Sequence, residues 1–130
     1  MGVLIADRME LPFIYVRQAP KEHGLMRQVE GEYAHGAKVV LIEDHVSTGG
    51  SSLNAINGLL KEGLDVMALI SIMTYSFRKT MEFFQDHQVQ HVSLSNLDTV
   101  LEQATAEGLI TADQAKKIYA FRDNPEAWQA

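Results

Sequence analysis

The chain has 130 residues, of which 46% are apolar, and this composition is typical of one globular domain with a buried core. Its formal net charge of −6 provides no basic surplus, which argues against binding to nucleic acid or to anionic membrane surfaces. It has no cysteine, and no apolar run reaches the ~18 residues that a membrane-spanning helix needs. We therefore expect a single cytoplasmic domain over residues 1–130, without membrane or nucleic-acid partners.

The predicted elements alternate between helix and strand along the chain. They are the end of a helix at 3–10, a short strand at 13–16, a long loop at 18–37 with a short ribbon near 27–33, a strand at 39–43, a helix at 52–62, a strand at 66–73, a helix over 77–84, a strand at 89–94, a helix from 97 that ends at Gly108, and a last helix opened by a capping box at Thr111 and Gln114. This order predicts an α/β fold with a parallel sheet and right-handed crossovers. Ligands of such sheets lie at the carboxyl ends of the strands, where we expect Arg17, Glu43 and Asp44.

The most informative segment follows the strand at 39–43. The strand ends on two adjacent carboxylates, Glu43 and Asp44, and a loop of hydroxyls and glycines, Ser47–Ser51, leads into a helix. Backbone N–H groups at a helix N-terminus lack intrahelical partners, and the helix dipole favours an anion there. The carboxylates can accept hydrogen bonds from sugar hydroxyls or hold a hydrated Mg²⁺. The pattern predicts a site for a phosphorylated sugar, and the alternative is an ordinary strand–helix turn with an acidic surface pair.

The long loop gathers positive charge in an otherwise acidic chain. Arg17, Lys21, His23 and Arg27 place up to four cationic or titratable groups within eleven residues. Such groups can stabilise the negative charge that develops on a pyrophosphate leaving group. The alternative is a solvated surface loop whose basic residues are incidental.

The segment from Glu43 to Ser51 closely resembles the binding motif for phosphoribosyl pyrophosphate (PRPP) of type I phosphoribosyltransferases, in the form of the orotate phosphoribosyltransferase branch. The family's landmarks before the motif are also present: Tyr15-Val16-Arg17, then Lys21, His23 and Gly24, then Gln28 to Gly31. Residues 72–77 and the last helix, which closes on Trp128-Gln129, fit as well, so the resemblance covers essentially the whole chain.

The resemblance implies a pentosyltransferase with a parallel-sheet, Rossmann-like core, which transfers ribose 5-phosphate from PRPP to orotate. It implies that Lys21 is catalytic, that Ser47 also contacts orotate, and that the enzyme is a homodimer. Mg²⁺ would be bound mainly through PRPP, with Glu43 and Asp44 as its possible protein contacts. The PRPP-binding residues that the resemblance implies are Arg17, Lys21, His23, Glu43, Asp44, His45, Val46, Ser47, Thr48, Gly49, Gly50 and Ser51.

The sequence departs from the family at its beginning. The family has an N-terminal lid and a pyrophosphate-binding strand and loop ahead of the residues matched here, and this strand lies between those matched by 13–16 and 39–43. Direct pairing of these two strands, strand exchange with another copy, or a separate polypeptide would each compensate. Two functional alternatives stay open: a non-catalytic PRPP- or nucleotide-binding regulatory module, and an inactive fragment that serves only a structural or assembly role.

Overall fold

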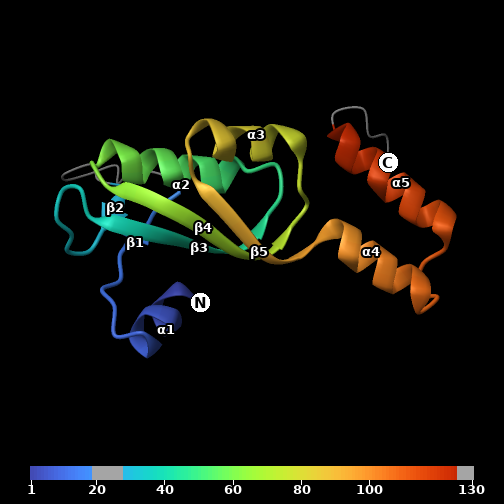
Figure 1. Cartoon of the computed structure of the whole chain (residues 1–130), viewed down its shortest axis with the longest axis horizontal. Helices are drawn as coiled ribbons and strands as arrows, with labels where there is room; N and C mark the ends of the chain where they lie inside the picture. The colour runs from blue at the N-terminus through green and yellow to red at the C-terminus, as the bar shows by residue number, and fades with distance from the viewer. Residues whose placement is uncertain (19–27, 126–130) are drawn as a thin grey trace.

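Three parallel strands form the central sheet, in the order β3-β4-β5 (Figure 1). The computed structural model of the chain describes residues 1–18 and 28–125. β3 comprises Lys38–Val46, β4 comprises Asp65–Thr74 and β5 comprises Gln90–Asn96. The helices α2 (Gly50–Lys61) and α3 (Arg78–Asp86) connect consecutive strands and lie on the same face of the sheet (Figure 1). The predicted α/β fold with a parallel sheet is therefore confirmed.

The core fills the space between this face of the sheet and the helices. Ile56 and Leu59 lie almost one turn apart on α2 and are fully buried together with Leu69 of β4 and Phe84 of α3. Burial of side chains of this size contributes about 1.5–3 kcal/mol each. Gly63, with a φ of +76°, lies in the turn between α2 and β4, in a backbone conformation that favours glycine.

The opposite face of the sheet is apolar and largely exposed. Its exposed side chains are Val40, Met67, Ile70, Ile72, Val92 and Leu94. The helix α1 (Gly2–Arg8) begins against this face, since a Cβ on Gly2 would lie 3.7 Å from the Cβ of Ile42, but α1 has no buried residue of its own. Within the described ranges β3 pairs only with β4, so its other edge is open. The strands predicted at 13–16 and 39–43 therefore do not pair directly with each other.

The short strand near residue 15 does not join the central sheet, contrary to the prediction. β1 (Tyr15–Val16) pairs antiparallel with β2 (Val29–Glu30) to form a separate ribbon. Val29 is buried in the core, which holds this ribbon against the rest of the domain. The partner of so short a strand cannot be read from its residue pattern, because two residues carry too little periodicity. Its partner lies in the ribbon that was predicted near 27–33.

Two helices continue from the carboxyl end of β5. α4 (Leu97–Ala106) and α5 (Ala112–Asp123) form a helical hairpin beyond the sheet (Figure 1). The predicted capping box is present: Gln114 N donates to Thr111 Oγ1 over 3.2 Å, and Thr111 N donates to Gln114 Oε1 over 2.8 Å. Among the residues that the structure describes, no helix has the length and apolar content to cross a bilayer.

Candidate functional site

The two adjacent carboxylates lie inside β3 and not at its end. The strand was expected over 39–43, but it continues to Val46, because His45 and Val46 pair with Met73 and Thr74 of β4. The Val46 side chain is fully buried. Of the residues expected at the PRPP site, Val46 therefore offers only its backbone, and its carbonyl already accepts a hydrogen bond from Tyr75 N over 2.9 Å.

Alternation along β3 separates the environments of Glu43 and Asp44. Glu43 faces α2, where the buried Ser52 donates its hydroxyl to Glu43 Oε1 over 3.3 Å. Partial burial raises the pKa of the Glu43 carboxyl, and the Ser52 hydrogen bond lowers it by a smaller amount. Glu43 is therefore a partly desolvated carboxylate, which gains from a further hydrogen-bond donor.

Asp44 is the water-exposed member of the pair, with 74% of its side chain accessible. Its Oδ1 accepts from the backbone N–H of His45 over 2.7 Å and lies 3.1 Å from His45 Nδ1. The backbone hydrogen bond from His45 is the main cause that lowers the pKa of Asp44. Asp44 therefore remains ionised under conditions in which Glu43 begins to accept a proton.

The loop after β3 leads directly into α2. Gly49 is the N-cap of α2 with a φ of +84°, and no side chain caps the helix. The first N–H groups of the helix therefore have neither an intrahelical partner nor a side-chain acceptor, as an anion site requires. A Cβ on Gly50 would meet no atom within 4 Å, so the space in front of the helix is open. The exposed side chains of Thr48 and Ser51 flank this space.

The first turn of α3 supports the loop from the side of β4. Thr80 is fully buried and donates its hydroxyl to the backbone oxygen of Ser47 over 3.3 Å. Sequence reasoning missed Thr80 and also Ser52. Ser52 carried one signal, since it lies nine residues after a strand carboxylate across a tight strand–helix turn. Thr80 carried none, because its contact depends on how the next crossover is placed.

Arg17 follows β1 in the ribbon, and the expectation that it ends a strand of the parallel sheet was wrong. Its Nε lies 2.7 Å from Glu30 Oε1, and the hydrogen bond to Glu30 raises the pKa of Arg17. The backbone next to it lies against α2, since Asn54 Nδ2 donates to Gln18 O over 2.5 Å. Arg17 thus lies near the first turns of α2. The predicted cations Lys21, His23 and Arg27 lie outside the described residues, as do Trp128 and Gln129.

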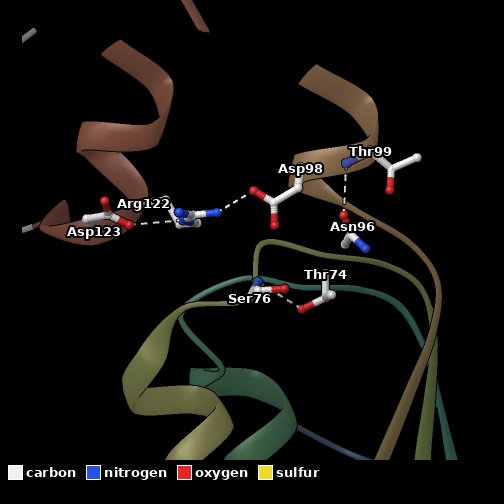
Figure 2. A network of polar contacts seen from close by, with 7 residues as sticks. All are labelled: Thr74, Ser76, Asn96, Asp98, Thr99, Arg122 and Asp123. Atoms are coloured by element: carbon white, nitrogen blue, oxygen red, sulfur yellow. Dashed lines mark hydrogen bonds and ion pairs between the residues drawn. The ribbon is translucent and has the colours of Figure 1, made fainter. Parts of the chain in front are cut away.

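A second group of polar side chains lies where β4 and β5 end (Figure 2). Arg122 of α5 donates from Nη1 to Asp98 over 2.5 Å and from Nε to Asp123 over 3.1 Å, which ties α5 to the start of α4. Ser76 has a φ of +56°, and its N–H donates to Thr74 Oγ1 over 3.0 Å. A hollow of about 350 Å³ opens here, lined by Ser76, Arg78, Arg122 and Asp123. Tyr75, which precedes Ser76, donates its backbone N–H to Val46 O over 2.9 Å, so the end of β4 lies beside the end of β3.

The carboxylates suit a metal that is bound mainly by a substrate. In the ranges 1–18 and 28–125, no group of three or more metal-binding side chains comes together. Mg²⁺ retains several waters and commonly uses one or two carboxylates together with substrate phosphates. The exposed, ionised Asp44 and the half-buried Glu43 fit that kind of shared site and do not fit a metal centre made of protein ligands alone.

Comparison with known proteins relates the chain to one group of enzymes. No protein-family model matches the sequence. The chain is 42% identical over 128 residues to orotate phosphoribosyltransferase of Streptococcus thermophilus strain CNRZ 1066, which covers 98% of this chain and 61% of the relative. It is 41% identical over 129 residues to the enzyme of the same name from Lactococcus lactis subsp. cremoris strain MG1363, covering 99% and 62%. The chain thus spans about three fifths of the length of these homologues.

Solved structures show the same relationship at the level of the fold. UMP synthase of Leishmania donovani superposes with a TM-score of 0.71 at 28% identity, over 92% of this chain and 26% of that one. Orotate phosphoribosyltransferase of Aeropyrum pernix superposes with a TM-score of 0.64 at 28% identity, over 78% of this chain and 55% of that one. The fold is the α/β fold of the type I phosphoribosyltransferases, and the chain is homologous to their orotate-specific branch.

Proposed function

We infer from this homology that the chain is the PRPP-binding core of an orotate phosphoribosyltransferase, an enzyme of pyrimidine biosynthesis. The observation that carries the proposal is the arrangement at the end of β3. Gly49 and Gly50 leave the N-terminus of α2 open to an anion, and two carboxylates with different solvation precede it on β3. The helix N-terminus lies at the carboxyl edge of a parallel sheet, where ligands of such folds bind, and the carboxylates lie within the last four residues of β3.

The 5-phosphate and the ribose of PRPP each have a counterpart in this arrangement. The N–H groups from Gly49 to Ser51 and the Thr48 hydroxyl receive the 5-phosphate. Glu43 and Asp44 accept hydrogen bonds from the ribose hydroxyls, and the added donors replace the water that partial burial denies to Glu43. Of the remaining residues expected at the site, His45 precedes the loop on β3, and Ser47 begins the loop and accepts a hydrogen bond from Thr80 through its backbone oxygen.

The reaction is a displacement at the anomeric carbon of the ribose. The bond from this carbon to the pyrophosphate oxygen breaks, and the pyrophosphate leaves with the electron pair. A bond to a ring nitrogen of orotate forms, and this nitrogen releases its proton to water. Positive charge develops on the sugar and negative charge on the leaving group, so positioning and charge stabilisation provide most of the catalysis. We assign the stabilisation of the pyrophosphate to Lys21, Arg17 and His23, with Lys21 as the main catalytic cation.

Mg²⁺ is the cofactor that we propose. When bound, it supplies positive charge that offsets the charge of the pyrophosphate and helps to fix its position. Asp44, with a lowered pKa, and Glu43 are the side chains that would help to hold it.

Two measurements on the chain test this function. Isothermal titration calorimetry with PRPP, with and without Mg²⁺, tests the binding site, and we expect Mg²⁺-dependent binding. An assay of orotidine 5′-monophosphate formation from PRPP and orotate tests the transfer. Binding without turnover would favour the non-catalytic PRPP-binding module. Absence of binding, in a chain with intact secondary structure, would favour the purely structural alternative and contradict the proposal.

A further inference from the structure

The side chain of Thr80, the third residue of α3, contacts a loop outside its own helix. Helical threonines commonly donate their hydroxyl to the carbonyl four residues earlier, and Thr105 of α4 does so, since its Oγ1 lies 2.8 Å from Leu101 O. The hydroxyl of Thr80 leaves its own helix and donates to Ser47 O over 3.3 Å. This carbonyl belongs to the loop at which we place the 5-phosphate, and none of the Thr80 side chain is exposed to solvent.

Thr80 also fills the space beside Gly49. A Cβ on Gly49 would lie 2.7 Å from Thr80 Cγ2 and 2.9 Å from Thr80 Oγ1, closer than non-bonded atoms tolerate. Gly49 therefore lacks a side chain for two reasons, its φ of +84° and the proximity of Thr80. The Thr80 hydroxyl holds the loop at Ser47, and the Thr80 methyl group limits the space at Gly49. A further hydrogen bond, from Tyr75 N to Val46 O, joins the residue before the loop to the segment that leads into α3.

We propose that Thr80 is a positioning residue that holds the loop Ser47–Gly49 in the conformation that receives a phosphate. It does not touch the ligand. Its role is to orient the backbone N–H groups before binding, so that the loop loses little conformational freedom when the phosphate arrives. The assignment of the ligand rests on the function proposed above, whereas the contact between Thr80 and the loop is a property of the free chain.

The matched pair for the test is Thr80→Val and Thr105→Val. Each variant removes one buried or half-buried helical hydroxyl that donates to a backbone carbonyl, and each retains the shape of the side chain, but only the first lies at the loop. We expect Thr80→Val to weaken binding of ribose 5-phosphate about tenfold, measured by calorimetry, and Thr105→Val to leave it unchanged. Thr80→Ser retains the hydroxyl and should restore most of the affinity.

A second measurement needs no ligand. In NMR spectra of the free chain, the backbone amides of residues 47–50 should shift in Thr80→Val and should not shift in Thr105→Val. The two side chains at the close contact should also be coupled in stability. We expect Gly49→Ala with Thr80→Ala to melt at a higher temperature than the sum of the two single changes predicts, because loss of the threonine makes room for the new methyl group.

The outcomes separate this inference from the proposed function. If the unmodified chain does not bind ribose 5-phosphate, the proposed function loses its support, and the free-chain amide shifts and the double variant still decide whether Thr80 orders the loop. If the chain binds but Thr80→Val binds equally well, or if both valine variants weaken binding equally, Thr80 has only a structural role and the inference is overturned.

Discussion

The hydroxyl of Ser52 donates a hydrogen bond to the carboxylate of Glu43 across the turn from β3 to α2, with 3.3 Å between the two oxygens. Ser52 is fully buried and Glu43 is half-buried, so a charged group and its donor share a site from which much of the water is excluded. The adjacent Asp44 on the same strand points into solvent. One dipeptide therefore contains carboxyl groups whose pKa values are shifted in opposite directions.

This difference predicts opposite effects of pH in two single variants. The folded-state pKa of Glu43 is raised, so its contribution to stability is greatest below its ordinary value of 4.5 and decreases as pH rises through the raised value. Glu43→Gln should therefore gain stability relative to the unmodified chain as pH rises through this window. Urea unfolding over a series of pH values measures the effect.

Asp44→Asn is the matched control for that experiment. The folded-state pKa of Asp44 is lowered, so its contribution is present above its ordinary value of 3.8 and is lost as pH falls through the lowered value. Asp44→Asn should therefore lose stability relative to the unmodified chain near neutral pH and match it in acid. Parallel pH profiles for the two variants would contradict the assignment of different environments to the pair.

The phosphate site that we propose at the loop Ser47–Ser51 predicts a variant that folds but does not bind PRPP. Thr48→Val removes an exposed hydroxyl, and Gly50→Val places a side chain in the open space before α2, where no protein atom lies within 4 Å of the new Cβ. We expect the double variant to retain its circular dichroism spectrum and to lose binding of PRPP by calorimetry. Thr99→Val, which changes an exposed threonine of α4, is the control and should bind normally. Unchanged affinity in the double variant would refute a phosphate site at this loop.

How far the sequence determines these features depends on the range of the interactions involved. The strands and helices of the central sheet follow from apolar periodicity, and the capping box at Thr111 follows from local hydrogen bonding, so both were predictable. The end of β3 was not, because Glu43 and Asp44 interrupt the apolar pattern although the ladder with β4 continues to Val46. The pairing of β1 with β2 was not either, because contacts between distant residues decide where so short a strand pairs.

The residues of the candidate site divide in the same way between local and long-range features. The residues from Glu43 to Ser51 form one continuous segment, so their composition and order indicated a phosphorylated sugar. The contact between Thr80 and Ser47 joins residues 33 positions apart. It depends on where the second crossover places α3, which no local pattern encodes.

Lys21 provides a prediction about rate. It lies in a segment without apolar periodicity, so Lys21→Ala should change the melting temperature little. In a complete, active form of the protein it should lower the turnover number by about 100-fold or more, as the loss of a charge-stabilising group does in other enzymes. Steady-state kinetics with PRPP and orotate measures the effect, and Lys116→Ala, which removes an exposed lysine of α5, is the control. Near-normal turnover of Lys21→Ala would exclude the role assigned to it.

The open edge of β3 and the apolar face of the sheet predict self-association. In the part of the chain that the structure describes, the outer edge of β3 is unpaired, and Ile72 of β4 and Leu94 of β5 are exposed on the same sheet, which favours association with another copy or another polypeptide. We expect at least a dimer of the chain in solution, by light scattering coupled to size-exclusion chromatography. Ile72→Lys with Leu94→Lys should shift the distribution towards monomer, whereas a monodisperse monomer of the unmodified chain would contradict the prediction.

The contact between the loop Ser47–Ser51 and α3 also indicates when the loop can become ordered during folding. The partners that shape the loop, from Val46 to Thr80, belong to consecutive elements of the chain, β3, α2, β4 and the start of α3. One crossover from β3 to β4 and the turn after it must therefore form before the loop is held in place, because both contacts span them. The loop should therefore gain protection from amide exchange together with the β3–β4 ladder and not before it.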